Sequence, residues 1–319
     1  MNYSSYFAKH IQNYLSFRES RGFKAQPYDK QLAYFDCWCV KNQPDAQELS
    51  REIVFQWIND KEPELIGVRA RVSSIRMFGE YLNAIGTTAY VLPKKYTAVS
   101  SSTAAYVFSD EELAALFSSI DMLPALPDEP FMDVIAPVMY RLIYTCGLRP
   151  NEGRELLTKN IDLGTGTVLI THTKMHKERL VYMSNDMLSL AREYDIQRRI
   201  IGNSSQYFFP SVSGTALSSH TVYAFFNRAW ASAVLPSGNI RRARIRVYDL
   251  RHRFATACLC KWLDAGENLL AMLPYLRQYM GHTTLAQTAY YIHILPENLL
   301  QTSQIDWAMF ENMFPEVSE

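Results

Sequence analysis

The nine residues YDLRHRFAT, at positions 248–256, decide how the second half of this chain is interpreted. Tyr248 and Arg251 lie three positions apart, so a helix through this stretch presents both side chains on one face. A guanidinium group stays charged at any working pH and matches a phosphate with two parallel hydrogen bonds. The stretch therefore predicts a helix that presents a phosphate-binding cation.

Other blocks of similar character flank this stretch. They are TCGLRPNE at 145–152, TKMHKER at 173–179, and MGH at 280–282 followed by YYIH at 290–293. Cleavage of a phosphodiester needs a nucleophile, cations on the non-bridging oxygens and an acid for the leaving oxygen. A tyrosine hydroxyl can serve as the nucleophile, and its covalent intermediate keeps the energy of the broken bond. The sequence contains no Walker loop, acidic metal cluster or zinc-ligand spacing, so we expect neither a cofactor nor a metal.

The composition is typical of a globular protein with two domains. The chain has 319 residues, of which 48% are hydrophobic and 20% charged. It contains no long uncharged apolar run and no basic, then apolar, N-terminal leader, so neither a transmembrane helix nor a secretory signal is predicted. The five cysteines suit a reducing cytoplasm. The pairs 37/39 and 258/260 are predicted to be small buried residues, because i, i+2 spacing on a helix points the thiols apart.

Charge is distributed unevenly along the chain, although the formal net charge is zero. Residues 141–282 carry 19 Lys or Arg against 10 Asp or Glu, whereas residues 101–140 and 283–319 contain no Lys or Arg. Local fields rather than the total charge steer a polyanion. The basic run Arg241, Arg242, Arg244 and Arg246 is predicted to follow a DNA backbone.

Hydrophobic periodicity predicts a mainly helical chain with a small β-hairpin, an α+β fold. Apolar residues at helical spacing predict helices near 6–22 and over 66–82, and a further helix over 131–146. The segment 91–106 has the composition of a linker, and Ser109 with Glu112 forms a capping-box pattern that begins another helix. The apolar runs 167–171 and 179–183 flank a polar stretch and predict the hairpin.

In order and spacing, the four blocks resemble those of the tyrosine recombinase (phage integrase) family. The resemblance covers the whole second half of the chain. It implies a helical core-binding domain over 1–90 that clamps DNA, a linker over 91–106, and a catalytic domain over 107–319. The amphipathic acidic stretch 305–314 is then a C-terminal helix, which is expected either to dock on its own domain or to join neighbouring protomers.

The resemblance also implies a role for each block. Arg149 and Arg251 would bind the scissile phosphate, Glu152 would orient Arg149, and His282 would hydrogen-bond the phosphate. Lys174 at the hairpin tip would protonate the leaving 5′ oxygen. Lys177 is an alternative for this acid, and otherwise contacts DNA together with Arg179.

Two neighbouring tyrosines compete for the role of nucleophile. The family places its tyrosine nine residues after the histidine that matches His282, which selects Tyr291 and puts His293 in a Tyr-x-His pattern. Adjacent residues on a helix point about 100° apart, so only one of the two can face the phosphate. Tyr290 is then a packing aromatic.

The block 248–256 departs from the family pattern at its first position. The family usually has a histidine where this chain has Tyr248. A phenol can donate a hydrogen bond to a phosphate oxygen, but with an ordinary pKa near ~10 it is a poor general base at neutral pH. His252 matches a family histidine and is interpreted as structural support.

The resemblance therefore predicts a site-specific DNA recombinase that cuts and rejoins strands through a 3′-phosphotyrosine, serving integration, excision or transposition. Its partners would be double-stranded DNA with paired sites, three further copies of the chain, and an accessory directionality factor. We expect it in the bacterial cytoplasm, on the nucleoid and not on a membrane. The alternatives are an inactive DNA-binding protein of the same fold and a topoisomerase-like or telomere-resolving strand transferase.

Overall fold

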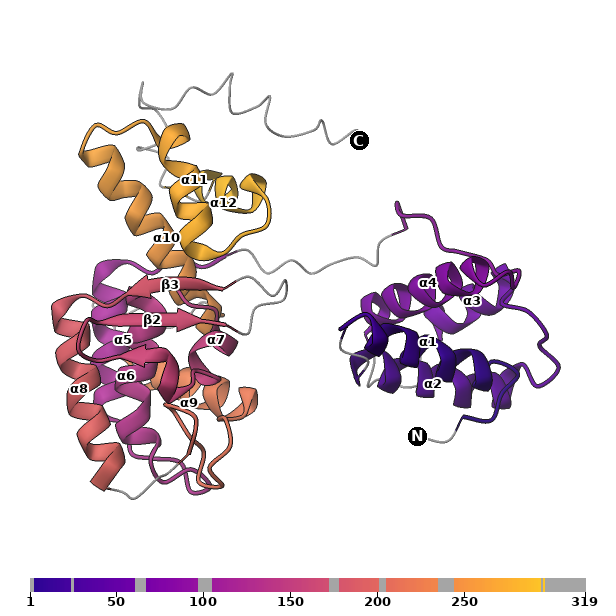
Figure 1. Cartoon of the computed structure of the whole chain (residues 1–319), viewed down its shortest axis with the longest axis horizontal. Coiled ribbons are helices and arrows are strands. Elements are labelled where there is room, and N and C mark those ends of the chain that lie inside the picture. Colours follow the sequence, from indigo (N-terminus) through magenta and orange to yellow (C-terminus); the bar gives the residue numbers. More distant parts are fainter. Residues whose placement is uncertain are drawn as a thin grey trace. The chain divides into compact units, whose positions relative to one another are not determined.

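The computed structural model describes residues 3–23, 26–60, 67–96, 105–171, 178–200, 205–234, 244–293 and 295 (Figure 1). The chain forms two compact units, residues 1–103 and 104–319, and each is described by itself. The predicted fold class is confirmed: in the described residues, helices dominate both units and the strands form one small sheet.

The N-terminal unit consists of helices packed around an aromatic core. The helices are α1 (Ala8–Ser20), α2 (Gln26–Asn42), α3 (Arg51–Asn59) and α4 (Val68–Ala84). Phe35, Trp57 and Phe78 are almost fully buried at its centre. Leu92 is also buried there, and the Tyr96 ring packs against Phe55. The chain after α4 therefore contributes to this core beyond residue 90.

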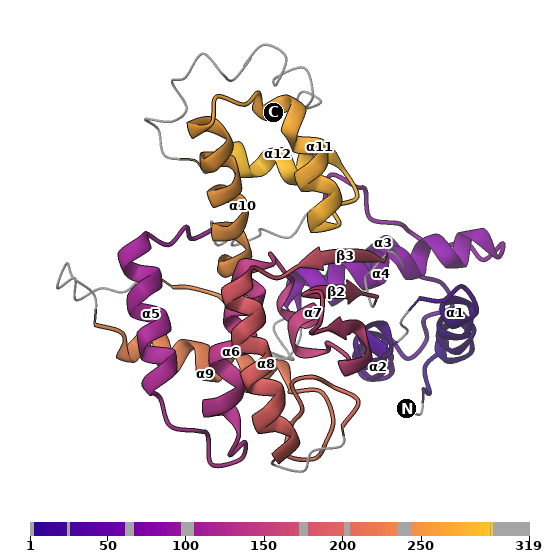
Figure 2. The same cartoon turned by 60° about the vertical axis from the view of Figure 1, so that its left-hand side comes forward.

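The C-terminal unit contains the other elements that the structure describes (Figure 2). Its helices are α5 (Asp110–Met122), α6 (Met132–Thr145), α7 (Pro150–Arg154), η1 (Thr158–Asn160), α8 (Asn185–Ile200), α9 (Ser219–Ser232), α10 (Val247–Asp264), α11 (Leu269–Met280) and α12 (Leu285–His293). The predicted capping box is present, because Ser109 Oγ accepts from the Glu112 backbone and the Glu112 carboxylate accepts from the Ser109 backbone.

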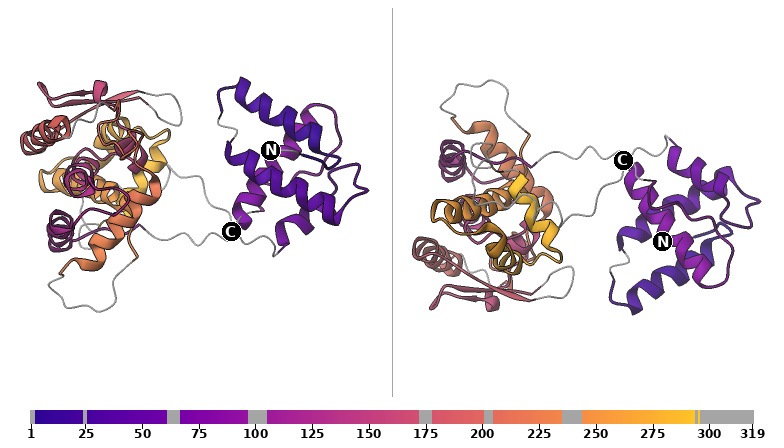
Figure 3. Two further views of the ribbon diagram at one scale, coloured as in Figure 1. Left: turned by 90° about the horizontal axis from the view of Figure 1, so that it is seen from below. Right: turned by 90° about the horizontal axis from the view of Figure 1, so that it is seen from above.

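The predicted hairpin is the larger part of a three-stranded antiparallel sheet. The strands are β1 (Ile161–Asp162), β2 (Thr167–Ile170) and β3 (Arg179–Tyr182), in the order β1-β2-β3. They lie along one side of the C-terminal unit (Figure 3). Val168 pairs with Val181, and both side chains are buried against the helices. Since strand residues alternate between faces, Arg179 also points inward.

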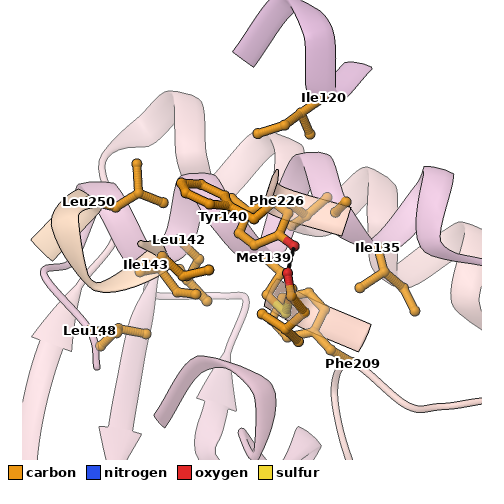
Figure 4. Packing of buried hydrophobic residues seen from close by; sticks show 14 of the residues in the cluster. Ile120, Ile135, Met139, Tyr140, Leu142, Ile143, Leu148, Phe209, Phe226 and Leu250 are labelled. Atoms are coloured by element: carbon orange, nitrogen blue, oxygen red, sulfur yellow. Dashed lines mark hydrogen bonds between the residues drawn. The ribbon is translucent and has the colours of Figure 1, made fainter. Parts of the chain in front are cut away.

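Helix α6 forms the centre of the main core. It packs against α5, α7, α8 and α10. The Tyr140 ring lies 5.2 Å from that of Phe226, and its buried hydroxyl donates to the carbonyl of Val222 at 2.6 Å (Figure 4). A buried phenol needs such a partner, because an unsatisfied hydroxyl in an apolar core is costly.

Helix α10 connects two hydrophobic clusters. Val247 and Leu250 near its start belong to the main core, whereas Leu259 and Leu263 pack with α11 and α12 (Figure 2). Arg251 lies at the junction and is completely buried. The helix therefore brings the residues of the 248–256 block between the main core and the segment that carries His282 and Tyr291.

We expect Gly147→Ala to lower the free energy of unfolding far more than Gly266→Ala. Both glycines follow a helix end with positive φ, 60° and 75°, which costs a residue with a Cβ roughly 1–2 kcal/mol. A Cβ at residue 147 would also lie 2.4 Å from the Phe254 ring, whereas one at residue 266 meets nothing within 4 Å. Urea unfolding of both variants checks this, and equal losses would contradict the packing argument.

Candidate active site

A buried carboxylate holds the first arginine of the site. Arg149 precedes the short helix α7, and its backbone N–H donates to Glu152 Oε2 at 2.8 Å. Its guanidinium also donates to Glu152 Oε1 at 2.8 Å. The side chain of Glu152 is only 4% exposed, whereas that of Arg149 is 31% exposed. Glu152 thus holds both the backbone and the side chain of Arg149 and leaves this cation open to solvent.

Arg179 binds the same carboxylate from strand β3. Its two terminal nitrogens donate to Glu152 Oε1 and Oε2 at 3.0 and 2.6 Å, a bidentate pair that is buried on both sides. Arg179, which the sequence predicted to contact DNA, is thus buried in an ion pair with Glu152. The alternation of β3 was the available signal, because Arg179 shares the inward face with Val181.

The charges around Glu152 keep it ionised. Burial by itself raises the pKa of Glu152. The hydrogen bonds and charges of Arg179 and Arg149 outweigh this effect and lower the pKa to about 2. Arg251 Nη1 lies 3.9 Å from the same carboxylate. Three guanidinium groups thus surround one carboxylate, and the excess positive charge makes this region attractive to an anion.

The second arginine of the site is fully buried. Arg251 donates to the carbonyls of Gly147 and Met280, each at 2.7 Å, and Nη2 lies 2.9 Å from His282 Nε2. A guanidinium can only donate, so His282 Nε2 must accept. The His282 proton is then on Nδ1, which donates to Thr288 Oγ1 at 2.9 Å. Burial and the neighbouring arginines lower the pKa of His282 to about 3, so its ring is neutral.

The turn after α11 brings these groups together. Gly281 ends α11 with a φ of 64°, and its carbonyl accepts from Arg149 Nη2 at 3.0 Å. A Cβ on Gly281 would lie 3.1 Å from Arg179 Nη1, tighter than ordinary side-chain contacts. Glycine therefore allows the turn to approach Arg179 closely while it positions His282.

Tyr291 and Tyr290 occupy different environments on α12. Tyr291 is 2% exposed, and its ring stacks on His282 with centroids 6.0 Å apart. Burial raises the pKa of Tyr291 to about 12, although the charge of Arg251 and a hydrogen bond with it act in the opposite direction. Tyr290 is 42% exposed. The structure thus places Tyr291, and not Tyr290, beside His282 and Arg251.

The block 248–256 supplies two further rings. The Tyr248 ring is half-buried and lies 5.0 Å from the His252 ring, which is itself 5.5 Å from Tyr291. Burial lowers the pKa of His252 to about 4, and its Nδ1 has no hydrogen-bond partner among the described residues. The His252 ring thus lies close to the rings of both Tyr248 and Tyr291.

Some of the other residues predicted to contact DNA lie in the described part of the chain and some do not. Arg244 is exposed, and Arg246 pairs with Asp249 at 2.8 Å at the start of α10 while its side chain stays 36% exposed. Outside the described residues lie Lys174, Lys177, Arg241, Arg242, the side chain of His293 and the predicted helix 305–314.

Neither a metal cluster nor a membrane span is found in the part of the chain that the structure describes. No group of three His, Cys, Asp or Glu side chains there could hold a metal ion. No helix there is both long and apolar enough to cross a bilayer.

Comparison with known proteins identifies relatives of the chain. The model of the phage integrase family matches residues 131–298. A Sinorhizobium fredii protein named as an integrase/recombinase, y4rB, is 26% identical over 299 residues, which cover 92% of this chain and 94% of that protein. The sequence similarity thus extends through both units.

Solved structures of recombinases share the fold. The XerH site-specific recombinase, in a post-cleavage complex with palindromic difH substrate, has a TM-score of 0.64 at 20% identity, covering 89% of this chain and 80% of that one. A lambda integrase tetramer bound to a Holliday junction has a TM-score of 0.59 at 17% identity, covering 88% and 76%.

We expect Arg179→Met to lower the free energy of unfolding by about 3–5 kcal/mol, because it leaves the Glu152 charge buried with one partner fewer. The folded-state pKa of Glu152, about 2, lies below its ordinary value of 4.5. Its contribution is therefore present above pH 4.5 and lost as the pH falls through about 2. Urea unfolding between pH 7 and 2 should show a weaker pH dependence in the variant.

The matched control is Asp121→Asn, which breaks the more exposed Arg141–Asp121 pair. Such surface pairs contribute about 0–1 kcal/mol. A loss in Arg179→Met no larger than in this control would contradict the buried-pair interpretation.

Proposed function

Because this chain belongs to the phage integrase family of tyrosine recombinases, enzymes that transfer DNA strands, we propose that Tyr291 is its nucleophile and that Arg149 and Arg251 hold the scissile phosphate. The observation that carries this proposal is the position of Tyr291, stacked on His282 beside the Arg251 guanidinium. Tyr290, the alternative, is 42% exposed, whereas Tyr291 is buried.

The cationic groups fit a phosphate that becomes more negative during reaction. Arg149 is part-exposed and its guanidinium is held by Glu152, so it can bind a DNA phosphate without first reorienting its side chain. Arg251 is fixed by carbonyls from two different segments. Cations that are already in place stabilise developing charge without reorganisation, and such stabilisation is often the main source of an enzyme's rate enhancement.

The reaction then proceeds through a covalent intermediate. The Tyr291 oxygen attacks the phosphorus, the bond to the 5′ oxygen breaks, and a 3′-phosphotyrosine and a free 5′ hydroxyl result. Lys174 supplies the proton for the leaving oxygen, in keeping with the family resemblance. Attack by the 5′ hydroxyl of a partner strand reverses the same chemistry, so the DNA is resealed without a cofactor.

The partner is double-stranded DNA with paired sites. The N-terminal unit and the basic segment around Arg244 and Arg246 contact the DNA backbone, and four copies of the chain assemble on two sites. The lambda integrase tetramer on a Holliday junction supports this assembly by its shared fold. Segment 305–314 joins the protomers, and an accessory factor sets the direction of recombination. The protein acts on the bacterial nucleoid, where it serves integration, excision or transposition.

We expect denaturing isolation of protein–DNA adducts to recover covalent DNA from cells that express the wild type and not from cells that express Tyr291→Phe. Phenylalanine keeps the ring that packs on His282 but lacks the attacking oxygen. Tyr290→Phe is the matched control and should retain adducts, and sequencing the attached DNA gives the target site.

The outcomes separate the alternatives. Adducts that persist in Tyr291→Phe and vanish in Tyr290→Phe would move the nucleophile to Tyr290. No adduct from the wild type, with the target present, would favour the inactive DNA-binding protein.

We expect Arg149→Lys to slow adduct formation on the recovered site by roughly 10²–10³-fold. Lysine keeps the charge, but it lacks the planar guanidinium that can donate to the phosphate and to Glu152 at the same time. Time courses with a duplex oligonucleotide measure this rate. Arg141→Lys, on the surface of α6, is the control and should react at the wild-type rate. Equal rates in both variants would exclude Arg149 from phosphate binding.

A further inference from the structure

His252 has a buried nitrogen that nothing described in the structure uses. The residue is 8% exposed on α10, and its Nδ1 is buried without a hydrogen-bond partner among the described residues. Buried polar atoms are rarely left in this state, and each such case needs an explanation. The rings of Tyr248, Tyr291 and Tyr290 lie 5.0, 5.5 and 6.4 Å from the His252 ring. The unused nitrogen thus lies in a cluster of phenols that includes the proposed nucleophile.

The other basic groups near Tyr291 already have partners. His282 Nε2 accepts from Arg251 and would lose that hydrogen bond on taking a proton, whereas Nδ1 already carries the proton that it donates to Thr288. The Asp249 carboxylate is held by the Arg246 backbone and guanidinium.

Glu152 and Tyr248 are no better as acceptors. The Glu152 carboxylate is held by Arg149 and Arg179. A phenol hydroxyl such as that of Tyr248 is a far weaker base than an imidazole nitrogen. Among the described groups around Tyr291, His252 is the imidazole whose Nδ1 has no hydrogen-bond partner.

We propose that His252 accepts the proton of the Tyr291 hydroxyl when this oxygen attacks DNA, an inference that rests on the proposed function of Tyr291. The Oη–H bond breaks and its proton moves to His252 Nδ1, while the Oη–P bond forms and the bond from phosphorus to the 5′ oxygen breaks. The leaving oxygen takes its proton from the separate acid. On resealing, protonated His252 returns its proton to the departing Tyr291 oxygen.

The surroundings of His252 suit this exchange. Burial lowers the pKa of His252 to about 4, so the ring is neutral at pH 7 and takes up a proton only when nearby negative charge offsets the burial. The groups that face it are Asp249, Arg246, Arg251 and the three tyrosines. Asp249 Oδ1 lies 3.8 Å from Nε2 and would stabilise the cation that forms, as would the negative phosphate in the transition state.

The proposal explains how this chain tolerates a tyrosine at position 248. Positions 248 and 252 are one helical turn apart on α10, so their side chains lie on the same face. A proton acceptor at either position reaches the same region. His252 then supplies the proton acceptor that the phenol of Tyr248 does not, and Tyr248 packs against it.

The test uses the full-length chain and duplex oligonucleotides that carry the site recovered from wild-type adducts. One duplex has the ordinary 5′ bridging oxygen at the scissile position, and the other has sulfur, a leaving group that needs no acid. We expect His252→Gln to cleave both duplexes ~10²-fold more slowly than wild type, the effect of a lost general base. Lys174→Ala should be slow on the oxygen duplex and recover on the sulfur duplex.

Two variants show that the loss reflects chemistry. His220→Gln, an exposed histidine on α9, should cleave at the wild-type rate. Tyr248→His combined with His252→Gln should regain at least tenfold of the lost rate, because it returns a proton acceptor to the same helix face. Thermal unfolding and non-covalent DNA binding of His252→Gln should match wild type, and if it does not fold, His252→Asn replaces it.

Cleavage by His252→Gln within twofold of wild type on both duplexes would overturn the proposal and leave the role of Tyr291 intact. Recovery of the His252→Gln cleavage rate on the sulfur duplex would also overturn the proposal, because His252 would then act on the leaving group. Recovery of the rate when the DNA is bound more tightly would overturn it as well, because His252 would then act on DNA affinity. Absence of adducts from the wild type is instead a failure of the proposed function itself.

Discussion

The site depends on the ion pairs that the buried Glu152 carboxylate forms with two arginines. This carboxylate accepts from the backbone and guanidinium of Arg149 and from both terminal nitrogens of Arg179. One anion thereby joins α7 to β3, and Arg149 in turn joins α7 to the turn at Gly281. Without this negative charge, three guanidinium groups would repel one another in a region of low dielectric.

Helix α10 gives the second constraint, since it belongs to two cores at once. Its first turns pack with the main core and its later turns with α11 and α12. Arg251 is fixed at the junction by the carbonyl of Gly147, in the turn after α6, and by that of Met280, the last residue of α11. The last carbonyls of a helix have no intrahelical partner, so the buried guanidinium and the Met280 carbonyl satisfy each other.

The sequence predicted the fold class and much of the element order, because periodicity and capping are local. The helix predicted over 131–146 is α6, residues 132–145, and the hairpin strands differ from prediction by one residue at their ends. It did not predict that residues 92 and 96 pack on the N-terminal core, since an isolated apolar residue in a linker-like segment gives no periodic signal.

The sequence by itself determined which charged and nucleophilic residues are candidates for the site, because the four blocks can be recognised from their residue types, order and spacing alone. Only the tertiary structure decided how each is used. It buried Arg179 against Glu152, placed Tyr291 and Tyr290 in different environments, and left His252 Nδ1 without a hydrogen-bond partner among the residues that the structure describes. Burial and hydrogen-bond partners depend on residues such as Arg251 and Gly147, 104 positions apart, and no local pattern contains that information.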